Sequence, residues 1–189
     1  MMPAGVEVLS LHEIGFEAEI EETGKTLEEN SLIKAKTVWN WIVESRKSKV
    51  ESIDGVFADD TGLEIDALNG EPGVYTARWA GSPAANRAKA LRELEGKDNR
   101  DCQFRTVITL LMNGDAPLNG GMIQVEGIVR GRIAEKEFGE GGFGYDPVFI
   151  PEGYDKTFGE LPAELKNHIS HRARAIQELI RVLNDGMME

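Results

Sequence analysis

Three glycines stand among four consecutive positions in the stretch Gly141-Gly142-Phe143-Gly144-Tyr145-Asp146-Pro147. Glycine loses more backbone entropy on folding than any other residue, so an ordered segment rich in it needs a reason. One interpretation is a tight turn with buried aromatic rings. The other is a binding loop, in which an open backbone, a flat ring and a carboxylate would suit the face and edge of a nucleobase.

Two neighbouring carboxylates, Asp59 and Asp60, follow the apolar segment 55–58 and precede Thr61 and Gly62. Successive side chains of a strand point to opposite faces, so the two carboxylates are not expected to serve one site equally. One of them could face a Mg²⁺ ion, which prefers oxygen ligands. The alternative is an Asx-type turn, which Asp and Gly favour.

A second acidic group surrounds Glu22, just before a Thr-Gly pair. No local capping role explains Glu22, although a solvated acidic loop stays open as an interpretation. Glu29 differs, because Thr26 and Glu29 have the spacing of a helix capping box. Lys34 follows in the same helix and could point towards a phosphate or lie on a solvated surface.

The basic stretch Lys166-Asn167-His168-Ile169-Ser170-His171-Arg172 contains a candidate helix cap, Ser170. Such a cap would place His171 and Arg172 in the first helical turn. Positive charge there opposes the helix dipole unless an anion or an acceptor lies nearby. That local conflict favours a functional role, and the alternative is an ordinary basic surface at a helix junction.

The strands that must position these residues are predicted from apolar alternation and β-branched runs. They cover residues 6–11, 55–58, 63–67, 102–111 and 122–133, the last as one strand or a pair, with a further strand ending at 149–150. Residues 59–62 are expected to separate the second of these strands from the third. A loop is expected at 47–54, and turns at 113–115 and 119–121.

Helices are predicted where apolar residues recur at helical spacing. One follows Thr26 and buries a face of Leu27, Ser31, Ala35, Val38 and Ile42. Another opens at Ser82-Pro83 and runs to about residue 95. Residues 162–184 form two helical pieces with a stripe of Leu165, Ile169, Ile176, Leu179 and Leu183. Irregular alternation of helices and strands indicates an α/β or α+β fold around a mixed sheet.

The composition limits the classes of partner. A chain of 189 residues is long enough for one substantial domain, and 41% hydrophobic residues are typical of a globular protein. Acidic residues outnumber basic ones by 33 to 21, which gives a net charge of -12. A nucleic-acid-binding protein usually has an excess of basic residues instead. The single cysteine, Cys102, excludes an internal disulfide and fits a reducing compartment. With no signal peptide or apolar span, we expect a cytoplasmic protein without a membrane partner.

Three segments occur together in the order of one known family: Ala58-Asp59-Asp60-Thr61-Gly62-Leu63, Gly142-Phe143-Gly144-Tyr145-Asp146-Pro147 and Ser170-His171-Arg172. The chain resembles the inosine triphosphate pyrophosphatases, which act on non-canonical purine nucleotides. Residues 29–35 and 70–78 match that family as well. The similarity extends from about residue 6 to residue 183, so we treat residues 1–189 as one domain of this kind.

The resemblance implies an elongated mixed central sheet flanked by helices, with two lobes and a nucleotide cleft between them. It also implies a homodimer. The implied reaction uses Mg²⁺ and cuts a purine nucleoside triphosphate with a deaminated base, namely ITP, dITP or XTP. The products are the nucleoside monophosphate and pyrophosphate.

The resemblance also assigns roles to residues of this sequence. Asp60 matches the general base and a metal ligand, and Glu22 matches the other acidic metal residue. Contacts with the substrate are implied for Lys34, Thr61, Phe143, Gly144, Tyr145, Asp146, Lys166, His171 and Arg172. Donors from Lys166 or Arg172 would bond a 6-keto oxygen and would meet a second donor in the 6-amino group of adenine.

One family motif does not occur in the chain. The family opens with a strand and a Thr-Gly-Asn-x-x-Lys loop that holds the triphosphate at a helix N-terminus. Family length implies that roughly 25 to 30 residues, comprising that strand, loop and helix, are missing before residue 1. An active pyrophosphatase with an incomplete sequence is the first hypothesis. A truncated, catalytically impaired remnant with its base pocket and dimer face, or a different metal-dependent phosphohydrolase, remain the alternatives.

Overall fold

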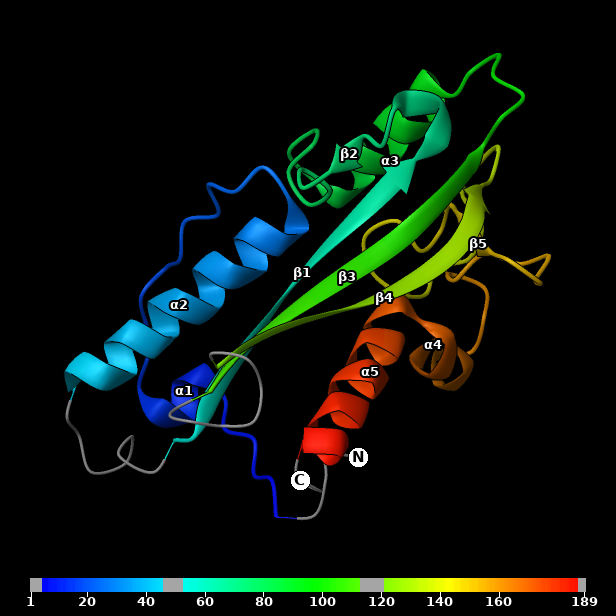
Figure 1. Ribbon diagram of the computed structural model, residues 1–189. Coiled ribbons are helices and arrows are strands. Elements are labelled where there is room, and N and C mark those ends of the chain that lie inside the picture. Colours follow the sequence, from blue (N-terminus) through cyan, green and yellow to red (C-terminus); the bar gives the residue numbers. More distant parts are fainter. Residues whose placement is uncertain (1–4, 46–52, 113–120, 187–189) are drawn as a thin grey trace. The chain divides into compact units, whose positions relative to one another are not determined.

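The computed structural model describes residues 5–45, 53–112 and 121–186 (Figure 1). The elements along the chain are α1 (Leu11–Ile14), α2 (Leu27–Ser45), β1 (Gly55–Ile65), the 3-10 helix η1 (Asp66–Leu68), β2 (Pro72–Gly73), α3 (Pro83–Glu93), β3 (Asp101–Met112), β4 (Met122–Ile133), β5 (Phe149–Pro151), α4 (Ala163–Ile169) and α5 (His171–Gly186). Helices and strands therefore alternate irregularly, as the sequence indicates.

The strands form one sheet in the order β2-β1-β3-β4-β5. The pairs β1–β2 and β4–β5 are antiparallel. Gly55 at the start of β1 lies against Leu111 at the end of β3. The amide of Met112 at the end of β3 donates to Gly121 beside the start of β4, at 2.8 Å. Neighbouring strands are therefore antiparallel throughout the described sheet, where we expected a mixed one.

The chain divides into two compact units. The first comprises Met1–Asp60, Val107–Glu126 and Ile176–Glu189, and the second comprises Thr61–Thr106 and Gly127–Ala175. Both units draw on the long strands β1, β3 and β4 and on helix α5, because the dividing points fall within these elements.

Each unit has its own hydrophobic core. In the first unit Phe16 packs edge-on against Trp41 of α2, with ring centroids 5.4 Å apart, above Val38 and Ile42. The core of the second unit includes a group of aromatic rings. Its buried residues are Leu63, Ile65, Ala90, Leu94, Cys102, Phe104, Val129, Ile133, Tyr145, Val148, Phe149 and Phe158.

The predicted helices are confirmed. All five residues of the expected apolar face of α2 are buried. The helix starts as a variant of the capping box. Thr26 Oγ1 accepts from the amide of Glu29, at 3.1 Å, while the Glu29 carboxylate accepts from the amide of Lys25 rather than of Thr26. Ser82 caps α3 by accepting from Ala85, at 3.2 Å.

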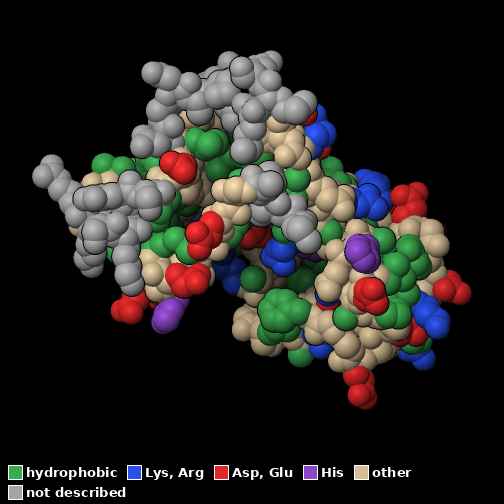
Figure 2. Space-filling view, turned by 90° about the horizontal axis from the view of Figure 1, so that it is seen from below, with side chains coloured by type: hydrophobic (Ala, Val, Ile, Leu, Met, Phe, Trp, Pro, Cys, Tyr) green, Lys and Arg blue, Asp and Glu red, His purple; other side chains and the backbone are tan. Residues whose placement is uncertain are grey.

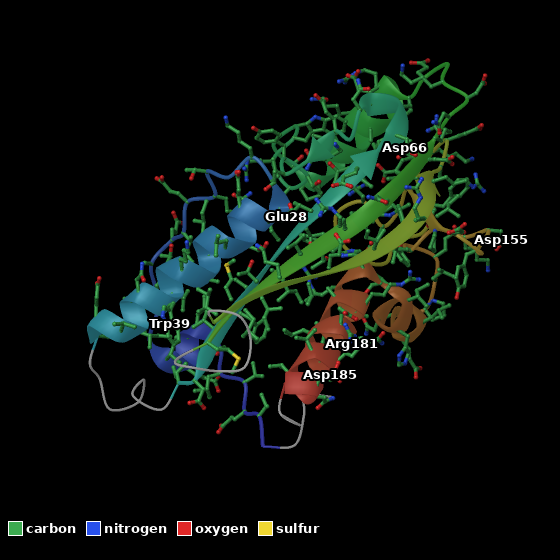
Figure 3. The ribbon with its side chains drawn as sticks, viewed as in Figure 1. Glu28, Trp39, Asp66, Asp155, Arg181 and Asp185 are labelled. Atoms are coloured by element: carbon green, nitrogen blue, oxygen red, sulfur yellow. The ribbon has the colours of Figure 1, made fainter. Side chains whose placement is uncertain are left out.

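The C-terminal helical region is two pieces, as expected, because Ser170 interrupts it. The Ser170 hydroxyl accepts from the amide of Ala173 in the first turn of α5. The solvent face of α5 carries ion pairs one turn apart, among them Arg181 and Asp185 (Figure 3), whose Nη1 and Oδ2 atoms are 3.0 Å apart. The strand predictions at 102–111, 122–133 and 149–150 are confirmed as β3, β4 and β5.

Two predictions about individual segments are wrong. Residues 6–10 form no strand, and Leu11 begins α1 instead. Ser10 and Glu13 bond reciprocally in a capping box, and such local bonds compete with strand pairing. Residues 59–62 do not interrupt a strand either, because β1 runs continuously through them, which rules out the Asx turn. The expected loop and turns at 47–54, 113–115 and 119–121 lie largely outside the described residues.

The described surface mixes acidic, basic and apolar side chains. On the face drawn in Figure 2, carboxylates and basic groups lie interspersed, so the acidic excess does not form a single patch on that face. Among the helices within the described ranges, none has the length and apolar character needed to cross a bilayer.

Candidate active site

Three of the predicted site residues meet in the first unit. The Lys34 ammonium of α2 donates to Glu22 Oε1 at 2.9 Å and to Asp60 Oδ1 of β1 at 2.8 Å. Asp60 is buried, with only 9% of the residue exposed, whereas Asp59 is less deeply buried. The alternation of a strand therefore selects Asp60 of the neighbouring carboxylates for this cluster.

Asp60 and Lys34 differ in how far their contacts offset the cost of burying their charges. Burial raises the pKa of Asp60, the hydrogen bond from Lys34 lowers it in part, and the nearby Glu22 carboxylate raises it again. Burial disfavours the Lys34 ammonium, but its hydrogen bonds to Asp60 and Glu22 prevail and raise the pKa of Lys34. One ammonium thus serves two carboxylates and is held in its charged form, while Asp60 lacks full compensation for its burial.

The chemistry of these donors fits Mg²⁺. Glu22 and Asp60 both direct an oxygen at one cation, the Lys34 ammonium, and together with it they leave a net charge of one negative unit. Mg²⁺ is usually held by one or two carboxylates together with substrate phosphates and water. Within the described residues no group of three or more His, Cys, Asp or Glu side chains forms a metal site by itself. Phosphate oxygens would therefore have to complete the coordination.

Asn30 supports this cluster and was missed by sequence analysis as a site residue. It is completely buried, and its Oδ1 accepts from the amide of Gly24 at 2.8 Å. A Cβ atom at Gly24 would lie 2.5 Å from that same oxygen, so the close approach requires glycine. Asn30 therefore fixes the turn that follows Glu22. A polar residue on the buried face of an amphipathic helix was the available sequence clue.

In the second unit, the glycine-rich loop wraps around Asp146. Lys166 Nζ forms an ion pair with Asp146 Oδ2, and the same oxygen accepts from the amide of Phe143 at 2.5 Å. Gly142 has a positive φ of 84°, and a Cβ atom there would overlap the Asp146 carboxylate. The carboxylate thus organises the loop and holds Lys166, which explains why Gly142 and Asp146 occur together.

The two aromatic residues of this loop differ in environment. Phe143 is 82% exposed, so its ring face is accessible. Tyr145 is buried in the core, where its hydroxyl donates to the carbonyl of Thr76 at 3.0 Å and burial raises its pKa. The Gly144 carbonyl accepts from Arg87 Nη1 at 2.8 Å, a contact that sequence analysis missed. Phe143 is therefore the ring of this loop that can stack on a ligand, and Tyr145 anchors the loop.

Thr61 and His171 are brought together through a residue that sequence analysis missed. Thr106 Oγ1 lies 2.8 Å from Thr61 Oγ1 and 2.6 Å from His171 Nδ1. The His171 ring also stacks on Phe104, with centroids 4.9 Å apart. Arg172 follows at the start of α5 and is exposed. A threonine in the fully buried part of β3 was the only sequence clue to Thr106.

The predicted site residues thus form two groups. Glu22, Lys34 and Asp60 belong to the first unit, and the second unit holds Thr61, Phe143, Gly144, Tyr145, Asp146, Lys166, His171 and Arg172. Asp60 and Thr61, consecutive in β1, join the two groups along the chain. The first group offers carboxylates and an ammonium, which suit a metal and phosphates, and the second offers a ring and several donors, which suit a base.

Comparison with known proteins defines the class to which this fold and site belong. The family model described as the Ham1 family matches residues 1–182. This protein is a member of the Ham1 family. The dITP/XTP pyrophosphatase of Flavobacterium johnsoniae is 46% identical over 186 residues, covering 97% of this chain and 88% of that relative. The dITP/XTP pyrophosphatase of Bacillus subtilis is also 46% identical, covering 96% of this chain and 86% of that relative.

Solved structures give the same family and confirm the fold. The Staphylococcus aureus Ham1 protein matches with a TM-score of 0.80 and 38% identity, over 95% of this chain and 87% of that one. A nucleoside-triphosphatase, or dITP/XTP pyrophosphatase, from Mycobacterium abscessus matches with a TM-score of 0.72 and 38% identity, at the same two coverages. A sheet with flanking helices is thus common to this chain and its structural relatives.

Proposed function

We propose that this protein is a Mg²⁺-dependent nucleoside triphosphate pyrophosphohydrolase that converts ITP, dITP or XTP to the monophosphate and pyrophosphate. The cluster of Glu22, Lys34 and Asp60 carries the proposal. It combines oxygen ligands suited to Mg²⁺ with a buried carboxylate that can accept a proton. Membership of the Ham1 family supports it, as do the names of the relatives from Flavobacterium johnsoniae and Bacillus subtilis.

Asp60 is suited to act as the general base. It is a buried carboxylate beside a second acidic side chain, and a positioned carboxylate can take a proton from a water within hydrogen-bond reach. As water forms a bond to the α-phosphorus and the bond to the pyrophosphate oxygen breaks, Asp60 would take the proton of the water. Mg²⁺, when bound by Glu22 and Asp60, supplies positive charge to the phosphates and to the leaving pyrophosphate. Lys34 orients both carboxylates and adds a further charge.

The second group would select the base. Phe143 offers an exposed ring for stacking, and Lys166 and Arg172 offer donors for a 6-keto oxygen. The 6-amino group of adenine would instead meet a second donor and leave both unpaired. Sites that bond a substrate group in this way reject analogues that cannot make the bond.

A substrate panel tests the proposal. The purified chain is assayed with ITP, dITP, XTP, ATP and dUTP, with Mg²⁺ and with a chelator, and the release of pyrophosphate and of orthophosphate is measured separately. We expect pyrophosphate from the deaminated purines, at a kcat/KM at least about 100-fold above that for ATP. Preference for dUTP would instead indicate a phosphohydrolase of another class. Absence of turnover with every nucleotide would indicate a catalytically impaired member of the family.

We also propose that the protein acts as a homodimer in the cytoplasm. The family resemblance supports the dimer, and the buried thiol Cys102, whose pKa burial raises, is consistent with a reducing compartment. Light scattering coupled to size-exclusion chromatography measures the mass directly, against 20.8 kDa for one chain. A monomeric mass across the micromolar range would contradict the dimer.

A further inference from the structure

The backbone around Phe143 is held by hydrogen bonds, although the ring of Phe143 is largely exposed. The Phe143 amide donates to Asp146 Oδ2 at 2.5 Å, and the Phe143 carbonyl accepts from the Asp146 amide at 3.1 Å. The next carbonyl along the chain, that of Gly144, accepts from Arg87 Nη1 at 2.8 Å. An exposed ring therefore projects from a loop whose backbone is fixed by two other side chains.

Arg87 reaches this loop from α3, a helix that is itself fastened within the second unit. Asn86 is buried, and its Nδ2 donates to the carbonyls of Thr76 and Ala77, at 3.1 and 3.0 Å. The Tyr145 hydroxyl donates to the same Thr76 carbonyl, at 3.0 Å. The helix and the loop thus share one anchor, and Arg87 adds a direct link between them.

The link made by Arg87 has a fixed direction, because a guanidinium only donates and a carbonyl only accepts. The side chain of Arg87 is 17% exposed, and its Nε lies 3.1 Å from Glu137 Oε1 but out of line for a hydrogen bond. Glu137 therefore offsets the charge, while Nη1 makes the directional bond to the loop. A charged donor gives a stronger hydrogen bond than a neutral one. The bond holds Gly144 at its positive φ of 60°.

We propose that Arg87 is a positioning residue that holds the glycine-rich loop so that the ring of Phe143 is in place to stack on a purine base. This inference rests on the proposed function, in which Phe143 is the stacking ring. Ordering a loop during binding costs free energy, and a loop that is ordered beforehand avoids that cost. Arg87 thus contributes to substrate affinity through Phe143 and without touching the nucleotide.

Matched variants of the full chain separate this role from a general loss of charge or packing. Arg87→Met keeps most of the apolar stem and removes the donors, while Arg87→Lys keeps a charged donor without the planar fork. Arg92→Met is the control, because Arg92 lies on the same helix with 65% of its side chain exposed. The control removes the same charge from the exposed face of α3.

The first readout is kcat and KM for dITP with Mg²⁺. For Arg87→Met we expect KM to rise about three- to tenfold, as for loss of one hydrogen bond, with kcat close to that of the parent. Arg87→Lys should change KM in the same direction by a smaller factor, and Arg92→Met should keep the parental values.

A double-mutant cycle tests whether Arg87 acts through the ring of Phe143. In a Phe143→Ala background, adding Arg87→Met should change KM by less than about twofold, because the ring to be positioned is gone. An equal change of KM in both backgrounds would overturn the inference, as would a fall in kcat at parental KM. Either result would mean that Arg87 affects catalysis by another route.

The second readout needs no turnover. Amide hydrogen exchange of residues 141–147 is measured in the ligand-free chain, with β3 as the internal reference. Arg87→Met should speed exchange of the Phe143 and Asp146 amides about three- to tenfold and leave β3 unchanged. Parental exchange in the loop, or equal acceleration in β3, would contradict the role of Arg87. If the parent hydrolyses no deaminated purine nucleotide, the proposed function fails, and the exchange rates still decide whether Arg87 orders the loop.

Discussion

Asp60 is buried, accepts from the Lys34 ammonium and lies near the Glu22 carboxylate, which is the environment of the proposed general base. Asp60→Asn keeps the shape of the side chain and removes its basicity. We expect kcat with Mg²⁺ and dITP to fall by about 10²–10⁴-fold, the usual contribution of a general base. The measurement is steady-state kinetics on protein shown to be folded by circular dichroism.

Asp59→Asn is the control for that variant, because the neighbouring side chain lies outside the contacts with Lys34 that are described above. It should retain most of the activity. If Asp60→Asn turned over dITP at the parental rate, or if both variants lost activity equally, Asp60 would not be the base.

The raised pKa of Asp60 also predicts a dependence of stability on pH. The folded chain binds this proton more tightly than the unfolded chain does, whose carboxyl has the ordinary pKa of 3.8. The stabilising contribution is complete below that value and is lost as pH rises through the folded pKa. Asp60→Asn, which cannot ionise, should therefore gain stability relative to the parent as pH rises above 3.8 and through the folded pKa of Asp60.

Urea unfolding in the presence of a chelator at several pH values measures this difference. Asp155→Asn removes a negative charge from an exposed position (Figure 3) and reports the general effect of charge on this acidic chain. A gain for Asp60→Asn that matched the gain for Asp155→Asn, or a trend of opposite sign, would contradict the assignment.

At the scale of elements, the contact of β4 with α5 depends on Gly127. A Cβ atom there would overlap the carbonyl oxygen of His171 and the amide nitrogen of Ala175, and these backbone atoms cannot rotate away. Overfilling a packed contact costs about 1–3 kcal/mol. We therefore expect Gly127→Ala to lower the free energy of unfolding by that amount and to weaken substrate binding, because the start of α5 must shift.

Met122→Ala provides the comparison on the same strand, since Met122 is 45% exposed. Denaturant titrations and KM for dITP are measured for both variants. A Gly127→Ala protein as stable as Met122→Ala, with parental KM, would show that α5 tolerates the extra methyl group.

At the scale of the whole molecule, the aromatic core of the second unit should dominate stability. Phe149 is completely buried, and its ring lies 4.8 Å from that of Phe104 and 5.2 Å from that of Phe158. Phe149→Ala should cost about 3–5 kcal/mol of the free energy of unfolding, as typical for a buried phenylalanine. Such a loss is a large share of the stability of an ordinary domain.

Phe143→Ala makes the same substitution at a ring that is 82% exposed, so its stability should stay within about 0.5 kcal/mol of the parent. Its KM for dITP should rise, because the exposed ring is the one proposed to stack on the base. Equal unfolding midpoints for the two variants would show that the buried cluster does not carry the stability of the unit.

The helices and most of the strands could be predicted from local patterns, because capping residues and the spacing of apolar side chains act over a few residues. The buried face of α2 and the Ser170 break between α4 and α5 are examples. The order of the short motifs also sufficed to predict the family. Local signals misled at residues 6–11, where a capping box prevailed, and at residues 59–62, where turn-forming residues lie within a strand.

Which of these residues lie in contact could be learned only from the folded chain. It chose Asp60 over Asp59 through a lysine 26 positions away, and it joined Thr61 to His171 through Thr106, 65 positions from the histidine. It also placed the ring of Tyr145 in the core and left that of Phe143 exposed. Such contacts depend on where the folded backbone brings distant side chains, and on burial, which sets the pKa of Asp60. Neither property is contained in the spacing of residues along the chain.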